Sequence, residues 1–366
     1  MFYREVGQFK STYAADQQVF RVTQDRFAII AMLAVAYLVF PFVMNDFWLN
    51  SIMIPFLVFS LATIGLNIVT GFTGLLSLGS GGFMGVGAYA AYKLTTYFPD
   101  ANIIVVILSA GAFSALIGIF FGLPSLRIKG FYLAVATLAA QFFLEWSFIR
   151  IEWLYNYNPS GAIEVPTREV AGIAVTGATA EPVHRYLVAL TIVVFLTWIA
   201  NNVLRGRVGR TWMAIRDMDI AAELIGIRLL PNKLLAFAFS SYYCGVAGAM
   251  MVFLWLGAAE VESFDINVSF QILFMVIIGG LGSLSGSFMG AALIFILPIL
   301  IRAFPGFLDG ILPPGYEFEI SGATAEHVQF IIVGSLIIFF LIVEPAGLAR
   351  LWQVARQKLR TWPFPY

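Results

Sequence analysis

The stretch GLNIVTGFTGLLSLGSGGFMGVGAYAAY, residues 65–92, combines apolar runs with eight glycines. A helix needs about 20 mostly apolar residues to cross the hydrocarbon core of a bilayer. Small residues between such helices let their backbones approach closely. The stretch therefore predicts closely packed membrane helices rather than the core of a soluble domain.

The composition of the whole chain agrees with this interpretation. Its 366 residues are 60% hydrophobic and 11% charged, with a mean hydropathy of +0.88, whereas soluble domains are about 25% charged. A single cysteine, Cys244, excludes an internal disulfide and a multi-cysteine metal site. The first 26 residues are polar and carry both charges, so we expect no removable signal peptide and a first span that stays as an anchor.

Apolar runs between polar breaks define the candidate spans. None shows the alternation of a membrane strand, so the predicted fold is an all-α polytopic membrane protein with about ten transmembrane helices. A re-entrant hairpin within 268–304 would reduce the number to eight or nine. The candidates are 27–43, 51–70, 75–97, 102–122, 131–148, 186–203, 234–257, 268–282, 284–304 and 327–343.

The charges predict the orientation of these spans. With both termini in the cytoplasm, ten spans place 16 Lys and Arg residues inside and five outside, which satisfies the positive-inside rule. The expected organisation is a cytoplasmic segment 1–26, a membrane domain 27–343 and a cytoplasmic tail 344–366. A cytoplasmic loop, 204–233, interrupts the membrane domain.

This loop contains GRVGRTWMAIRDMDIAAELIGIRLLPNKL, residues 206–234. Thr211 is a candidate N-cap, and Gly226 followed by Pro231 marks a helix end. The spacing of the apolar residues between them predicts one amphipathic helix over 211–226. Arg216, Asp219 and Glu223 recur on another face. The apolar stripe consists of Trp212, Ile215, Met218, Ala222 and Ile225.

Two interpretations of the loop compete. Arginines near a membrane end fix orientation, so the loop could be only a topology anchor. An anchor does not need a capped helix with a small face at Ala221 and Ala222, however. Such a face suits docking into a groove of another protein, so we favour a docking site for a cytoplasmic partner.

Motifs for chemistry are missing. The chain has no Gly-Lys pair and hence no phosphate-binding P-loop, and it has no H-E-x-x-H or G-x-S-x-G motif. We expect no catalytic residue, metal or cofactor, and an ion-driven carrier is disfavoured because ionisable residues are scarce within spans. Glu145 is the main exception. We place it at the outer interface, beside Trp146, with a place on the solute pathway as the alternative.

Glycines recur at intervals of four within the candidate spans. This spacing predicts close helix packing, and glycine breaks could also expose helix ends to a solute. With Glu145, the candidates for packing or the pathway are Gly81, Gly85, Gly282, Gly286 and Gly290.

Five segments in order resemble the permeases of branched-chain amino acid ABC transporters, in particular the longer of their two permease subunits. The resemblance covers about residues 50–350, and the loop motif is its most specific part. The segments are LNIVTGFTGLLSLGSGGFMGVGAY, LRIKGFYLAVATLA, RVGRTWMAIRDMDIAAELIGIRLLPNKLLAFAFSSYYCGVAGAM, FMVIIGGLGSLSGSFMGAAL and VEPAGL.

The resemblance implies an importer of the bacterial inner membrane, in which the permease carries no enzyme activity. Its partners would be a second permease subunit, two cytoplasmic ATP-binding subunits and a periplasmic solute-binding protein, with no nucleic acid. YNYNPSGAIEVP replaces a glycine-rich stretch of the family, so urea or a short amide is the alternative solute. A membrane scaffold or intramembrane enzyme is the alternative class. The resemblance assigns the coupling helix to Gly209, Arg210, Ala214, Arg216, Asp217, Ala221, Ala222 and Gly226.

Overall fold

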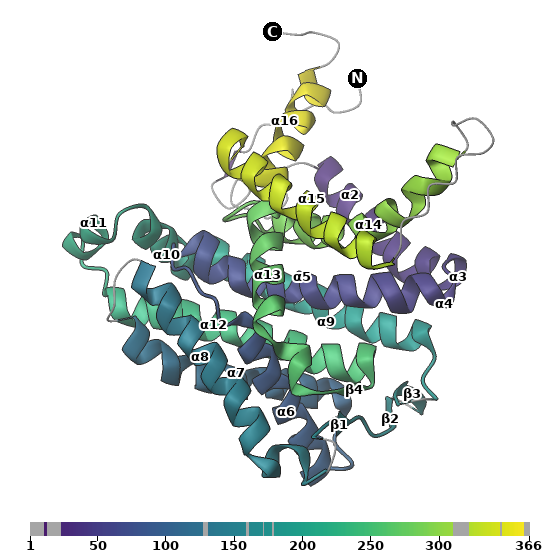
Figure 1. Ribbon diagram of the computed structural model, residues 1–366. Helices are drawn as coiled ribbons and strands as arrows, with labels where there is room; N and C mark the ends of the chain where they lie inside the picture. The colour runs from purple at the N-terminus through teal and green to yellow at the C-terminus, as the bar shows by residue number, and fades with distance from the viewer. Residues whose placement is uncertain are drawn as a thin grey trace.

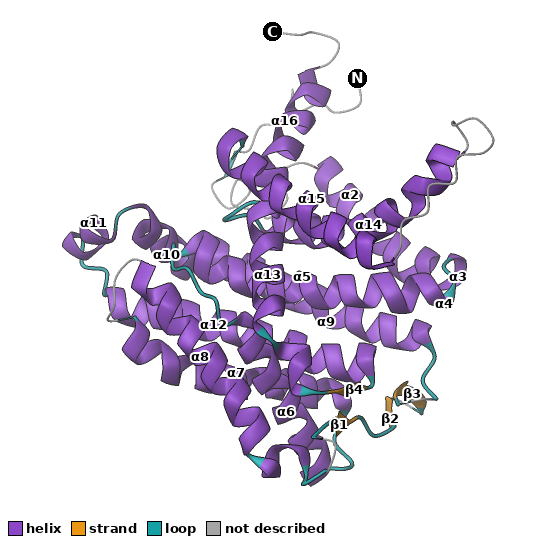
Figure 2. Ribbon diagram, in the orientation of Figure 1, coloured by secondary structure: helices purple, strands orange, loops and turns teal. Residues whose placement is uncertain are grey.

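The computed structural model describes residues 11–12, 23–126, 131–158, 161–170, 172–177, 179–309, 322–344 and 346–361. Most of the predicted segment 1–26 and the end of the predicted tail 344–366 lie outside these residues. The described part is predominantly helical, with four short strands, which confirms the all-α fold class (Figure 2).

The first half of the chain forms α2 to α8, with π-helical turns (η1 to η3) inside the first two apolar runs. The order is α2 Thr23–Ala34, η1 Val35–Val39, α3 Phe40–Val43, α4 Asp46–Trp48, η2 Leu49–Met53, α5 Ile54–Asn67, η3 Ile68–Phe72, α6 Ser80–Tyr97, α7 Ile103–Ser125 and α8 Phe131–Arg150.

The second half begins with short elements at one end of the bundle and ends with α16. The order is η4 Glu152–Tyr155, β1 Ile163–Glu164, β2 Arg168–Val170, β3 Ile173–Thr176, α9 Pro182–Arg205, α10 Arg207–Asp217, α11 Asp219–Leu224, α12 Leu229–Met250, η5 Met251–Leu256, β4 Ala258–Ala259, η6 Val261–Phe264, α13 Ile266–Gly279, α14 Leu284–Asp309, α15 Gly322–Val343 and α16 Gly347–Thr361.

Seven helical segments of the described chain are long and apolar enough to cross a membrane. Counting the bent pair His327–Val343 and Gly347–Lys358 as one span gives eight. Phe27–Val43 is a shorter apolar helix. The candidate 75–97 is one helix, but it begins only at Ser80, so the predicted start was wrong. The count of ten and the cytoplasmic termini stay predictions. The seven are Asp46–Phe72, Ile103–Ser125, Tyr132–Arg150, Pro182–Arg205, Leu229–Leu256, Val261–Gly279 and Leu284–Ile301.

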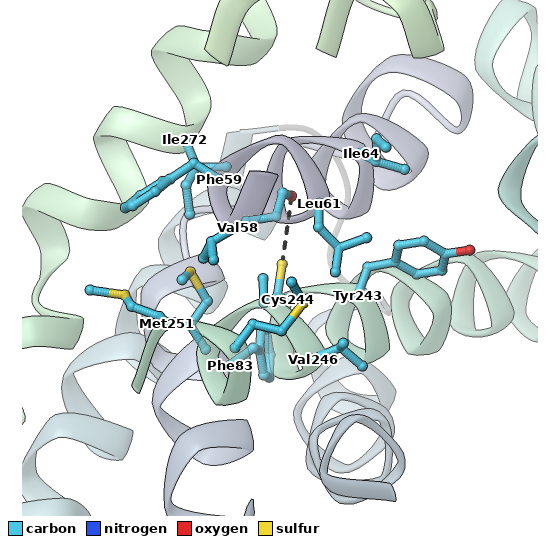
Figure 3. Close-up of a cluster of buried hydrophobic side chains, with 14 of the residues drawn as sticks. Val58, Phe59, Leu61, Ile64, Phe83, Tyr243, Cys244, Val246, Met251 and Ile272 are labelled. Atoms are coloured by element: carbon cyan, nitrogen blue, oxygen red, sulfur yellow. Dashed lines mark hydrogen bonds between the residues drawn. The ribbon is translucent and has the colours of Figure 1, made fainter. Parts of the chain in front are cut away.

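The centre of the bundle is α12, which packs against α5, α6 and α7. Figure 3 shows Val58 and Leu61 of α5 pointing toward the part of α12 that carries Tyr243 and Cys244. The Cys244 thiol lies 3.9 Å from the carbonyl oxygen of Ala62. The single cysteine is therefore a buried packing residue.

Glycines bring α12 close to its neighbours. A Cβ added at Gly87 of α6 would lie 2.0 Å from the carbonyl oxygen of Gly245, and one at Gly248 would lie 1.9 Å from that of Met84. Real Cβ atoms do not approach backbone this closely, so the α6–α12 contact requires glycine on both helices.

The two ends of the bundle differ. The short α10 and α11 lie at one end of α9, and β2 and β3 lie at the other (Figure 1). The β1–β4 and β2–β3 pairs are antiparallel, and Ile163 pairs with Ala259. We call these the α10 end and the strand end.

Gly87→Ala should destabilise the protein in detergent by about 1–3 kcal/mol, because the added methyl overpacks the α6–α12 contact. Gly334→Ala in α15 is the matched control, since its Cβ would meet nothing within 4 Å. Thermal unfolding of the purified variants measures the difference. Equal stability of the two variants would contradict the packing assigned to Gly87.

Candidate functional site

The loop between α9 and α12 forms two short helices. The chain turns at Gly206, and α10 starts at Arg207, only one residue after α9 ends. Gly209 is buried in this corner, and a Cβ there would lie 2.0 Å from the carbonyl oxygen of Leu204. Gly209 therefore permits the sharp α9–α10 corner.

Trp212 fixes α10 to α12. Its side chain is fully buried, its Nε1 donates to the carbonyl oxygen of Asn232 at 2.9 Å, and its ring packs edge-on against Phe239. Ile215, on the same face, is also buried. An indole usually finds a hydrogen-bond partner when buried. The first half of the predicted apolar stripe is thus an internal anchor of the loop.

The predicted single helix over 211–226 was wrong in its start and its continuity. Thr211 is not an N-cap, because it lies within α10 and its hydroxyl donates to the carbonyl oxygen of Arg207. The helix breaks at Met218, whose backbone is extended (φ −161°, ψ 100°). The predicted stop holds: α11 ends at Leu224, and Gly226 follows with φ +89°. Since the break rotates α11 relative to α10, one stripe does not continue across both.

The outward surface of α11 is apolar, and its members differ from the predicted docking face. Ala222 is 2% exposed and packs inside this chain, although Ala221 is exposed. Sequence reasoning missed Ile220 and Leu224, whose spacing of four was the available signal. We call the exposed residues the α11 patch: Met218 at 64%, Ile220 at 66%, Leu224 at 83% and Ile225 at 75%.

The charged residues of the loop form other ion pairs than the helical spacing of Arg216, Asp219 and Glu223 suggests. Arg216 forms an ion pair of 2.9 Å with Asp217, and Asp219 lies 3.8 Å from Lys233 of α12. The guanidinium of Arg216 also donates from Nη1 to the carbonyl oxygen of Gly71 at 3.1 Å. Arg216 thereby links the loop to the end of the helix that contains α5.

The remaining loop candidates occupy different environments. Arg210 is exposed and Ala214 is half-buried. A Cβ at Gly226 would meet nothing within 4 Å, so its positive φ rather than crowding favours glycine there. Of the residues assigned by resemblance, the loop thus presents Arg210, Arg216, Asp217, Ala221 and Gly226 outward and holds Gly209 and Ala222 within.

The glycine candidates near α13 form two kinds of contact. A Cβ at Gly286 or Gly290 of α14 would lie 2.5 Å or 1.9 Å from a carbonyl oxygen of α13. Gly282 instead lies in the turn between these helices with φ +76°. Helix packing therefore accounts for Gly286 and Gly290, and turn geometry accounts for Gly282.

The other two glycine candidates lie near the start of α6. The chain before α6, residues 74–79, is not helical, and the amide of Leu78 donates to Thr137 Oγ1 at 2.9 Å. A Cβ at Gly81 would lie 2.9 Å from the carbonyl oxygen of Asp265, and one at Gly85 would meet the ring of Phe148. Thr137 is the seventh residue of the 20-residue α8. Because Gln141, the eleventh residue of α8, accepts from the amide of Gly82, the start of α6 lies beside the middle of that membrane-spanning helix.

Glu145 belongs to a polar cluster at this break. Gln141 is fully buried, and its Oε1 accepts from the amide of Gly82 and from Ser269 Oγ. Its Nε2 donates to Glu145 Oε1 at 2.7 Å and to the carbonyl oxygen of Phe264 at 2.8 Å. This cluster supplies partners to backbone groups that the break leaves without a helical partner.

A cavity of about 570 Å³ opens at the strand end. It lies between the α6–α7 connection and the β2–β3 pair, and its charged lining residues are Asp100, Arg168 and Glu169. Among the described residues, no group of three or more His, Cys, Asp or Glu side chains is placed to hold a metal ion.

Broken, glycine-packed membrane helices with a partly exposed loop at one end define a polytopic helical membrane protein, and broken helices of this kind occur in transporters. The chain matches, over residues 48–341, the family described as branched-chain amino acid transport system / permease component. It therefore belongs to that family.

Two curated relatives are similar over most of the chain. Both are the high-affinity branched-chain amino acid transport system permease protein LivM, one from Salmonella typhimurium and one from Escherichia coli. Each is 29% identical over 315 residues, which cover 80% of this chain and 68% of the relative. No solved structure matches the chain. Together with the apolar helices, the relatives support a multi-pass protein of the inner membrane.

Trp212→Ala should release the loop between α9 and α12, because it removes a buried side chain worth about 3–5 kcal/mol together with the bond to Asn232. Limited trypsin digestion of the purified protein should cut at loop arginines at least several times faster. Thr211→Ala is the control, since its hydroxyl bonds only within α10. Unchanged digestion of the Trp212 variant would contradict the anchoring role.

Proposed function

We propose that this permease imports branched-chain or related amino acids and takes its energy from two cytoplasmic ATP-binding subunits that bind the loop between α9 and α12. The observation that carries this proposal is the α11 patch. It places four large apolar side chains, between 64% and 83% exposed, on a loop that Trp212 anchors to the bundle. The chain itself contains no P-loop, so hydrolysis requires a partner.

The α11 patch supports docking by a helix into a groove. Ile220 and Leu224, at a spacing of four, lie on one face of α11, and the charged residues Asp219 and Glu223 belong to the same short helix. An apolar centre with a polar rim is typical of protein–protein interfaces. A pure topology anchor needs only the arginines, so it does not account for Ile220 and Leu224.

The full importer would also contain a second permease subunit and a periplasmic solute-binding protein. The cavity at the strand end supports this arrangement, because the strand end lies opposite the α10 end (Figure 1). Carboxylates of Asp100 and Glu169 and the guanidinium of Arg168 offer polar contacts to a protein partner there. In this assembly the permease moves solute and catalyses no reaction of its own.

Leu224→Asp and Ile220→Asp should each weaken copurification of the ATP-binding subunits at least tenfold, because each places a carboxylate in an apolar contact. Ile173→Asp is the control, since Ile173 is 46% exposed on β3 at the strand end. Retention of the subunits by both α11 variants would contradict docking on the patch.

Leucine uptake by vesicles containing the complete transporter tests the solute class. Excess valine or isoleucine should reduce the uptake of labelled leucine, whereas urea and acetamide should leave it unchanged, because these amides lack the branched apolar side chain that the three amino acids share. Uptake of labelled urea by the same vesicles, with none of leucine, would instead establish the urea alternative.

A further inference from the structure

The turn between α13 and α14, residues 280–283, lies against the end of α5. Gly280 and Gly282 have φ of +119° and +76°, conformations that side chains other than glycine rarely adopt. The turn ends one helix and starts the next, so several of its backbone groups have no helical partner. Its position therefore depends on groups supplied by other segments.

Asn67, in the last turn of α5, supplies those groups. Its side chain is fully buried, and its Oδ1 accepts from the amide of Gly282 at 2.8 Å. Its Nδ2 donates to the carbonyl oxygen of Ser283 at 2.9 Å and to Ser287 Oγ at 3.0 Å. One carboxamide thus uses its acceptor and both donors to hold the turn and the first turn of α14 against α5.

The same end of α5 also contacts the loop that carries the α11 patch. Arg216 Nη1 binds the carbonyl oxygen of Gly71, one helical turn after Asn67. A Cβ at Gly71 would lie 1.9 Å from Asn67 Oδ1 and 2.3 Å from the amide nitrogen of Gly282. A Cβ at Gly282 would lie 3.0 Å from Arg216 Nη1. The loop, the end of α5 and the turn are therefore in direct contact, and the side chains of Arg216 and Asn67 join their backbones.

The other end of α13 reaches the break before α6. Ser269 Oγ accepts from the amide of Gly81 at 2.8 Å, and the carbonyl oxygen of Phe264 accepts from Gln141. The 14 residues of α13 span about 21 Å at the rise of an α-helix. A displacement of the turn would thus be carried along one short helix to the middle of the membrane.

We propose that Asn67 is a positioning residue that makes α10, the end of α5 and α13 move together. Movement imposed on α10 by a docked ATP-binding subunit then changes the position of the α6 break, where the solute pathway would open or close. This inference rests on the proposed docking of the ATP-binding subunits. It assigns to Asn67 a role in transmitting movement, separate from binding either ATP-binding subunit or solute.

The test uses the complete transporter in vesicles, with Asn67→Ala in this chain. Copurification of the ATP-binding subunits and solute-stimulated ATP hydrolysis should stay within about twofold of wild type. Leucine taken up per ATP hydrolysed should fall about tenfold, a size typical of coupling between sites. The same ratio should fall equally in Asn67→Asp, because aspartate keeps the acceptor but lacks both donors.

Ser109→Ala is the control. Ser109 Oγ donates to the carbonyl oxygen of Val106 at 2.9 Å within α7, so this variant also loses a side-chain-to-backbone bond, at a site away from α10 and α13. Its ratio of uptake to hydrolysis should equal that of wild type. Should the Asn67 variants fail to assemble, Ser287→Ala carries the test, since it removes only one of the bonds and should lower the same ratio severalfold.

A second readout separates transmission from simple destabilisation. If Asn67 and Arg216 act through one contact network, then Asn67→Ala combined with Arg216→Lys should lower the uptake ratio little more than the worse single variant. The inference would be overturned if the losses of the two single variants multiplied in the double variant. A wild-type ratio in both Asn67→Ala and Ser287→Ala would also overturn it, as would equal proportional losses of assembly, hydrolysis and uptake. Failure of the proposed function would appear differently, as wild-type protein that does not retain the ATP-binding subunits.

Discussion

Backbone amides and carbonyls that leave a helix inside an apolar medium must find partners within the protein, and this constraint governs the organisation of the chain. It is met at two places by polar side chains from distant segments. Thr137, Gln141 and Ser269 bind the amides around the start of α6. Asn67 binds the turn between α13 and α14. Each unpaired group would cost several kcal/mol in hydrocarbon. These polar side chains therefore determine where the broken segments lie.

Glycine makes these contacts geometrically possible. At the α6–α12, α13–α14 and α5–turn contacts, an added Cβ would meet backbone atoms at 2.6 Å or less. The helices therefore touch backbone to backbone, and movement of one must displace the next. This close contact explains why a loop at one end of the bundle is connected to the middle of the membrane through only a few residues.

The sequence predicts the fold class and the location of the charged loop because both depend on long-range averages, namely apolar length and the spacing of charges. It predicts the spans less well. Residues 75–79 are apolar and resemble a span, but they are not helical, because Thr137 and Gln141 of α8 supply partners to the chain around the start of α6. Likewise, the periodicity over 211–226 does not reveal the break at Met218, which buries Ala222 and exposes Ile220. Contacts between distant segments determine both features, and the spacing of residues along the sequence does not reveal such contacts.

In the loop between α9 and α12, the residues that anchor the loop to the bundle differ from those that a partner can contact. Trp212 and Ile215 are buried against the bundle, whereas Ile220 and Leu224 face outward. A partner that binds the outer residues gains affinity only to the extent that the loop is already ordered, because ordering a flexible loop opposes binding. Order is equally necessary for transmission, since a loosely held loop would absorb the movement of its partner. The buried tryptophan and the exposed patch therefore depend on each other: the first gives the second both a fixed position and a connection to α12.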